Sequence, residues 1–160
     1  MKTNLMACAL GGILALTANA AWAEVHEVEV LNMGSDGDRM VFEPALVEAE
    51  PGDTVRFVFK DPGHNAAAYH PDNRGKPELI PAGADVWDSG FKSPGQDYEV
   101  SFSTEGAHHY YCLPHEGLGM VGIIAVGDAS KGPGLDAVEN ADIPGKAKQL
   151  FRELHKELKE

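Results

Sequence analysis

Apolar and polar residues alternate with a period of two in several short segments between residues 25 and 126, a pattern that predicts β-strands with one buried face. Five segments alternate in this way or are strand-like in residue type: VHEVEVL (25–31), TVRFVFK (54–60), DYEVSFS (97–103), HHYYC (108–112) and MVGIIAV (120–126). Turn-forming sequences such as EPGDT, DPGH, SPGQ and TEGA separate them. Short strands without intervening helical patterns predict an all-β sandwich or Greek-key barrel.

Two regions depart from this pattern. Residues 64–87 are rich in Pro, Gly, Asn and Asp, and we expect a long loop there with a helical turn near residues 66–68. The sequence GLDAVENAD (134–142) predicts a short helix, and PGKAKQLFRELHKELKE (144–160) predicts a longer one. The apolar stripe of the longer helix consists of Ala147, Leu150, Phe151, Leu154 and Leu158. Because such stripes usually pack against the parent domain, we expect a β-domain over 24–128 and a helical extension over 129–160 packed on it.

The first 23 residues predict export. Lys2 precedes an apolar run too short to span a membrane, and AWA (21–23) is a small-x-small cleavage sequence, so residues 1–23 are identified as a signal peptide. The competing cleavage sequence is ANA, which ends at Ala20. A lipidation motif at LMAC (5–8) is disfavoured because the apolar stretch follows Cys8 instead of preceding it. No other stretch approaches the roughly 20 apolar residues of a membrane span, so we expect no stable membrane insertion.

The chain has 160 residues and a formal net charge of −12. The acidity belongs to the β-domain, since residues 24–128 hold 19 acidic and 6 basic side chains, whereas residues 129–160 hold 6 of each. This balance argues against nucleic acid and anionic membranes as partners. It favours a protein partner with a cationic face.

Removal of the signal peptide leaves Cys112 as the single cysteine, so no disulfide can form within the mature chain. Cys112 opens the sequence CLPHEGLGM, in which His115 and Met120 follow at a Cys-x2-His-x4-Met spacing. One thiolate, two imidazoles and a weak thioether are the ligands of a blue-copper centre. His64, at a turn after the strand 54–60, can supply the second imidazole. The alternatives are a buried structural cysteine, or zinc, which accepts Cys and His but has little use for a thioether.

The neighbours of these residues fit a metal site. Pro114 has no N–H group to donate toward the sulfur, and Gly117 and Gly119 permit a tight return of the loop. Asn65 directly follows His64 and is placed to join the two ligand loops by hydrogen bonds.

Other side chains near these loops have two interpretations each. Glu116 either biases docking toward cationic partners or is simply solvated. His70 is either a surface-loop residue or an extra ligand. His108 and His109 lie on one strand, so alternation points one inward and the other outward.

The sequence YYCLPHEGLGMVG (110–122) resembles the ligand loop of the plastocyanins, and GMVGIIAVGD (119–128) followed by a helical tail resembles the pseudoazurins, both of them blue copper proteins. The resemblance implies an eight-stranded Greek-key cupredoxin barrel over 24–128 with one type 1 copper that cycles between Cu(I) and Cu(II). It places the metal ligands on His64, Cys112, His115 and Met120. It also implies that His115 lies at the surface within an apolar patch and serves as the electron port. The resemblance to the plastocyanins further suggests an electron route at Tyr111, and the alternative is that Tyr111 packs at the surface.

Three features depart from these families. The segment YHPDNRGKPEL (69–79) lengthens the stretch between His64 and Cys112 beyond that of the pseudoazurins. The acidic barrel differs from the lysine-rich surroundings of pseudoazurin copper sites. His108 stands where plastocyanins carry a tyrosine. The first two departures leave the partner open, and none of the three removes a ligand.

We therefore expect a periplasmic one-electron carrier, not an enzyme. It would act as a monomer between redox proteins with a cationic docking face, such as a cytochrome or a copper reductase. Copper delivery is one alternative, but Met33, Met40 and Met120 are too dispersed for a typical copper carrier. A mononuclear copper enzyme is the other, and it would need an open coordination position in place of Met120. The 7 histidines are scattered, which disfavours a second catalytic centre.

Overall fold

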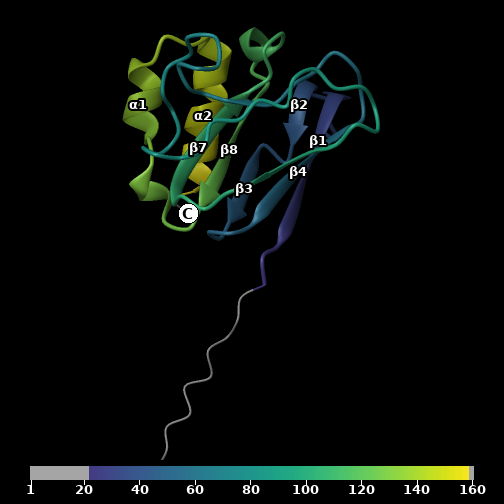
Figure 1. Cartoon of the computed structure of the whole chain (residues 1–160). Helices are drawn as coiled ribbons and strands as arrows, with labels where there is room; N and C mark the ends of the chain where they lie inside the picture. The colour runs from purple at the N-terminus through teal and green to yellow at the C-terminus, as the bar shows by residue number, and fades with distance from the viewer. Residues whose placement is uncertain (1–21, 159–160) are drawn as a thin grey trace, which may run out of the picture.

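The computed structural model describes residues 22–158, which form two four-stranded β-sheets packed face to face, with two helices on the outer side of one sheet (Figure 1). Predictions for residues 1–21, which include most of the signal peptide, lie outside the described residues. The strands are β1 (Val25–Met33), β2 (Arg39–Glu43), β3 (Leu46–Ala49), β4 (Thr54–Phe59), β5 (Ala67–Ala68), β6 (Tyr98–Ser101), β7 (Gly106–Tyr111) and β8 (Val121–Val126). The helices are α1 (Leu135–Asn140) and α2 (Gly145–Glu157), with 3-10 turns η1 (Glu116–Leu118) and η2 (Ala129–Lys131).

The strand order is β2-β1-β4-β6 in the first sheet and β3-β8-β7-β5 in the second. β1 pairs in parallel with β4, and β3 pairs in parallel with β8, whereas the other pairs are antiparallel. The expected eight-stranded all-β architecture with a C-terminal helix is confirmed. None of the helices within residues 22–158 has the length and apolar character needed to cross a membrane.

Strand β5 corrects one expectation from the sequence, the helical turn near residues 66–68. Ala67 and Ala68 are extended and pair with Tyr111 and Tyr110 of β7. Alanine favours helices in isolation, but this preference is weak and tertiary context overrides it. Pairing with β7 gives the buried backbone groups of this segment their hydrogen-bond partners, so pairing decides the conformation.

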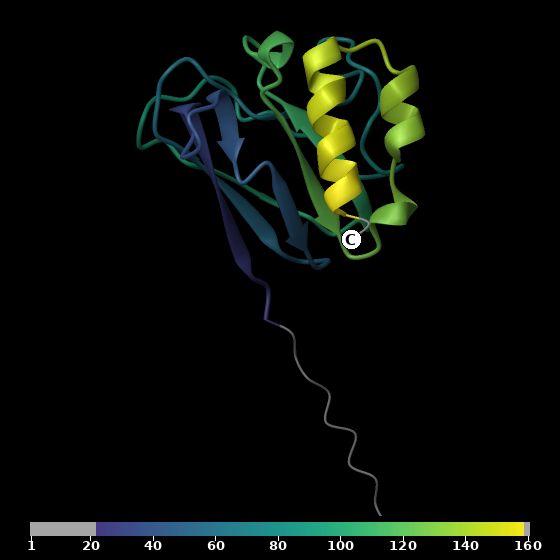
Figure 2. The ribbon, with the colours of Figure 1, turned by 180° about the vertical axis from the view of Figure 1, so that it is seen from behind.

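Two apolar cores surround the second sheet. The core between the sheets includes Val28, Phe57, Trp87, Tyr110 and Ile124. The core between the second sheet and the helices includes Tyr69, Tyr111, Ile123, Val138 and Phe151. Seen from behind, α2 lies across β7 and β8 (Figure 2). Both faces of these two strands are therefore covered, and every residue of β7 and β8 is buried.

This double burial corrects the prediction for His108 and His109. Alternation does send them to opposite faces, but neither face meets solvent. The His108 ring lies 5.1 Å from the ring of Phe102, on the side between the sheets. The His109 ring lies 4.9 Å from the ring of Phe151, on the side of α2. The helical extension thus turns an outward-facing strand position into a core position.

The chain segments with potential ligands meet at one end of the sandwich. His64 follows β4 and forms an isolated bridge with Lys92. Cys112 directly follows β7, and β8 begins at Val121, with Tyr111 of β7 opposite Val121 in the antiparallel register. The connection between these strands therefore starts and ends at the same edge, and it must return on itself within residues 112–120.

Candidate metal centre

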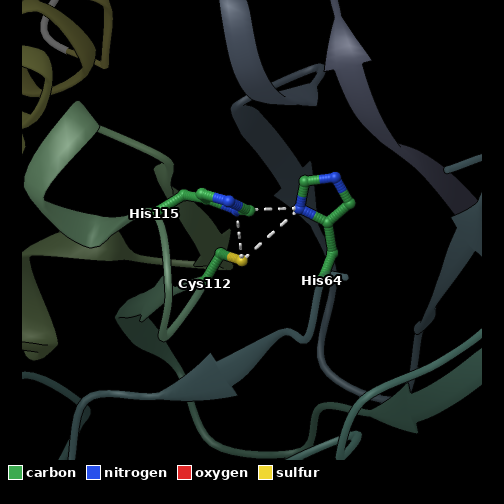
Figure 3. A group of neighbouring side chains, drawn as sticks. All are labelled: His64, Cys112 and His115. Atoms are coloured by element: carbon green, nitrogen blue, oxygen red, sulfur yellow. Dashed lines mark hydrogen bonds between the residues drawn. The ribbon is translucent and has the colours of Figure 1, made fainter. Parts of the chain in front are cut away.

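Three predicted ligands converge in the folded chain. The Sγ atom of Cys112 lies 3.6 Å from Nδ1 of His64 and 3.6 Å from Nδ1 of His115. The two Nδ1 atoms are 3.1 Å apart. Figure 3 shows the three side chains pointing toward one another from two different loops. His64 and Cys112 are buried, and His115 is half-buried.

These separations fit donor atoms that share one metal ion. Sulfur and imidazole nitrogen bind first-row metals at roughly 2.3 and 2.0 Å, so two such ligands about 110° apart are separated by roughly 3.3 to 3.6 Å. The ring of His64 is also in the correct tautomer for binding. Its Nε2–H donates to Oδ1 of Asn32 at 2.9 Å, which leaves the Nδ1 lone pair facing the cluster.

Backbone hydrogen bonds fold the 112–120 loop tightly. The N–H of Cys112 donates to the carbonyl of Met120 at 3.0 Å, and the N–H of Met120 donates to the carbonyl of His115 at 3.2 Å. Gly119 has a φ of 91°, a left-handed conformation that favours glycine. Met120 is fully buried, as is Cys112. The loop therefore brings the backbone of Met120 back beside that of Cys112, at the same end of the sheet.

The predicted role of Asn65 agrees with the geometry. Its Oδ1 accepts a hydrogen bond from the N–H of Leu113 at 2.7 Å, and its Nδ2 donates to Oδ1 of Asp88 at 3.1 Å. Asn65 follows His64, and Leu113 follows Cys112, so the first bond joins the two loops that carry the converging side chains.

Burial keeps the cluster neutral. It raises the pKa of Cys112 to about 11, although the backbone N–H groups of Asn65 and His115 act in the opposite direction. Burial also lowers the pKa of His64, with a further lowering from the neighbouring His115. The pKa of His115 is lowered by burial as well. At neutral pH both imidazoles can therefore offer lone pairs, and a metal that binds the thiol must displace its proton.

The structure overturns both interpretations of Glu116. This residue is only 5% exposed, so it is neither solvated nor available for docking. Its Oε1 accepts from the hydroxyl of Tyr69, and its Oε2 accepts from Nζ of Lys76.

Tyr111 is also buried, in contrast to both expectations for it. Its ring is 1% exposed and lies under the 69–79 segment, with Nζ of Lys76 5.0 Å from the ring centroid. Its hydroxyl donates to the carbonyl of Asn73. His70 lies half-buried in the same segment, where its Nδ1 accepts from the N–H of Asp72 at 3.1 Å.

Sequence reasoning missed Asn32, the residue that orients His64. Asn32 lies near the end of β1, far from either ligand loop in sequence, and the parallel pairing of β1 with β4 brings it near. A polar residue at a strand end is a common pattern, so no local signal distinguishes this one.

Comparison with known proteins identifies close relatives. Residues 28–127 match the family described as copper binding proteins, plastocyanin/azurin family. The chain is 41% identical over 150 residues to the pseudoazurin of Paracoccus pantotrophus, which covers 93% of each chain. It is 36% identical over 119 residues to the chloroplastic plastocyanin of Tetradesmus obliquus, covering 72% of this chain and 73% of the relative. The crystal structure of native pseudoazurin from Hyphomicrobium denitrificans superposes with a TM-score of 0.69 at 32% identity, covering 83% and 97% of the two chains.

Proposed function

The chain belongs to the plastocyanin/azurin family of copper-binding proteins, and on that premise we propose that it is a pseudoazurin-like one-electron carrier with a single type 1 copper site. The ligands in this proposal are His64, Cys112, His115 and Met120. The observation that carries it is the convergence of three donor atoms, from residues up to 51 positions apart, within 3.6 Å of one another. Bound copper supplies a Cu(I)/Cu(II) couple that exchanges one electron at a time.

The role of the protein is to hold the donor atoms in one arrangement for both oxidation states. Asn32 fixes the ring of His64, and Asn65 fixes the start of the loop that carries His115. Burial of His64 and Cys112 excludes water from the sulfur and from one imidazole. Because little has to rearrange when an electron arrives or leaves, transfer is fast. Fixed polar groups need no reorganisation at that moment.

The half-buried ring of His115 is the proposed electron port. Pro114 on one side of it is exposed, and Leu118, two residues beyond Glu116, is 52% exposed. An apolar rim of this kind lets a partner approach closely without stripping water from charged groups. Tyr111, by contrast, is covered and offers no surface for contact.

We also propose that the protein is not an enzyme. Of the residues between 22 and 158, His64, Cys112 and His115 form the one group of three His, Cys, Asp or Glu side chains close enough to hold a metal ion. Other histidines are engaged in structural contacts, as His26 is with Asp53. Oxygen or nitrite chemistry needs an open coordination position, and a site with Met120 as the fourth ligand has none.

The proposed partners are redox proteins with a cationic docking face, and the proposed compartment is the periplasm, reached through the signal peptide at residues 1–23. The excess of acidic side chains over residues 24–128 supports a cationic partner. Steering by such charges should weaken as ionic strength rises. We expect the carrier to act as a monomer, with 129–160 as an extension of the 24–128 domain.

The spectrum of the Cu(II)-loaded mature protein tests this function, with Cys112→Ser and Met120→Leu measured beside it. We expect an intense visible charge-transfer band and a narrow copper hyperfine splitting in the wild type. Cys112→Ser should abolish the band, and Met120→Leu should shift it and change the reduction potential. A pale spectrum that does not depend on Cys112 would overturn the blue-copper assignment.

A further inference from the structure

Glu116 is a buried carboxylate placed directly after His115, and both of its oxygen atoms are occupied. The hydroxyl of Tyr69 donates to Oε1 at 2.7 Å, and Nζ of Lys76 donates to Oε2. A buried charge is costly unless it is paired and hydrogen-bonded. Tyr69 and Lys76 together meet both conditions, so Glu116 is fixed in place by two partners.

Both partners belong to the 69–79 segment, which is itself fixed to β7. The N–H of Tyr69 donates to the carbonyl of His109 at 3.0 Å, and the N–H of His109 donates to the carbonyl of Leu79 at 3.1 Å. The N–H of Leu79 also donates to the carbonyl of Tyr69 at 3.0 Å, which closes the segment at its base. The partners of Glu116 therefore stand on a hydrogen-bonded frame and not on a free loop.

The interior of the segment is tied down as well. Nδ2 of Asn73 donates to the carbonyls of Ala68 and Trp87, at 2.8 and 3.0 Å. The ring of Tyr69 packs against the ring of Tyr111, with the centroids 4.7 Å apart. These contacts connect the segment to the second sheet, in which β7 leads directly into Cys112.

The loop between Cys112 and Met120 is consequently held at two points outside its own backbone. Near its start, Leu113 is bound by Asn65. At its tip, Glu116 is bound by Tyr69 and Lys76. His115 lies between these two points, so its position depends on both.

We propose that Glu116 is a positioning residue of the metal centre, which fixes the loop carrying His115 to the 69–79 segment through Tyr69 and Lys76. The proposal rests on the copper-carrier function proposed above. It makes the 69–79 segment, which has no ligand in it, a structural part of the copper site. Loss of either contact should loosen the loop and change the geometry at the metal.

The test compares Glu116→Gln and Tyr69→Phe with the wild type in the full mature protein. Tyr69→Phe removes one hydrogen bond and leaves every charge in place. Glu105→Gln is the matched control, because Glu105 pairs with Lys131 just before β7, at the strand's other end from Cys112. It removes the same charge and also leaves a lysine without its carboxylate.

Two measurements are needed. In the copper-free protein, amide hydrogen exchange over residues 116–120 should quicken by about ten-fold or more in Glu116→Gln and Tyr69→Phe. In the Cu(II)-loaded protein, the relative intensities of the visible bands, the copper hyperfine splitting and the reduction potential should change in both variants. Glu105→Gln should match the wild type in exchange and in spectrum.

The proposal is overturned if Glu116→Gln and Tyr69→Phe behave like Glu105→Gln in both measurements. If Glu116→Gln does not fold, Tyr69→Phe decides alone, since it deletes a single hydroxyl. Failure of the carrier function would look different, because the wild type itself would then lack a Cys112-dependent visible band. The exchange experiment on copper-free protein would still report whether Glu116 anchors the loop.

Discussion

The side-chain oxygen of Asn65 accepts a hydrogen bond from the backbone N–H of Leu113 at 2.7 Å. The two residues are 48 positions apart, and each directly follows a proposed copper ligand, His64 in one loop and Cys112 in the other. Asn65 is 1% exposed, so water cannot replace this bond without a rearrangement. The bond therefore sets the distance between the two loops.

Replacement of Asn65 by Ala should weaken both the fold and the metal site. Loss of a buried acceptor leaves the Leu113 N–H unsatisfied, which costs about 1–3 kcal/mol of unfolding free energy. Copper affinity should fall by about 10- to 100-fold, the usual effect of removing a residue that orients metal ligands. Urea unfolding and competition with a copper chelator measure the two effects.

The control for this variant is Asn140→Ala. Asn140 is exposed in α1, where its Nδ2 donates to the carbonyl of Asp136. This change should leave copper affinity unaltered. Equal affinities in the Asn65 and Asn140 variants would show that the bond to Leu113 does not hold the loops together.

Gly122 on β8 should tolerate no side chain. A Cβ atom there would lie 2.4 Å from Cζ and Oη of Tyr110 and 2.7 Å from the carbonyl oxygen of Ala45. Gly122→Ala therefore forces the buried Tyr110 ring to move, and overpacking of this kind costs typically about 1–3 kcal/mol.

Gly145→Ala in α2 is the matched control, because its Cβ meets nothing within 4 Å. It should keep or slightly raise stability, since Ala favours helices. Denaturant midpoints for the two variants check this, and a stable Gly122→Ala protein would contradict it.

The loop that carries three of the proposed ligands could be recognised in the sequence because its residues lie close together in the chain. Cys112, His115 and Met120 lie within nine residues, and their side chains have little reason to occur together outside a copper site. The sequence likewise predicts β1, β4 and β6 by alternation, β7 and β8 by strand-like residue type, and α2 by its helical spacing. Each of these signals depends only on residues near one another in the chain.

The failures have a common cause in long-range packing. His109 is buried because α2 covers the face toward which alternation points it, and Glu116 is buried because the 69–79 segment folds over it. Short strands such as β5 form only because β7 is there to pair with them. None of these partners is near in sequence, so the local pattern favoured an outward direction for one of the two histidines, a surface role for Glu116 and a helical turn for Ala67 and Ala68.

Tyr111 should play no part in electron exchange with partners. Its ring is covered by the 69–79 segment, so a partner cannot contact Tyr111 directly, whereas His115 is partly exposed. Tyr111→Phe should leave the electron self-exchange rate within about two-fold of the wild type. Leu118→Asp should lower it markedly, because the exposed position 118 lies beside the port and like charges would then oppose each other in the encounter of two copies. NMR line broadening of mixed Cu(I) and Cu(II) protein measures the rate. A large effect of Tyr111→Phe with none of Leu118→Asp would reverse the assignment.

His109 should make the folded state sensitive to acid. Its Nδ1–H donates to the carbonyl of Leu79 at 2.8 Å, so its Nε2 accepts from Nε2–H of His155 at 2.9 Å. Burial, followed by the charge that His155 can carry, lowers the pKa of His109 from 6.5 to about 3. The unfolded chain therefore binds a proton below pH 6.5 that the folded chain refuses until about pH 3. Stability contributed by the neutral ring is present above pH 6.5 and is lost as pH falls toward 3, by up to about 1.4 kcal/mol per pH unit.

His109→Gln isolates this contribution, because glutamine can still donate to Leu79 and accept from His155 but does not titrate. The unfolding free energy of the copper-free protein should fall less steeply between pH 6.5 and 4 in the variant than in the wild type, by up to the slope of one proton. Copper-free protein is the right sample because His64 and His115 then titrate alike in both chains and cancel in the comparison. Stability at pH 7.5 can differ between the two proteins without affecting the test, since the slope is the readout. Identical slopes would mean that the His109 ring accepts a proton in the folded protein as readily as in the unfolded chain, which would contradict the prediction.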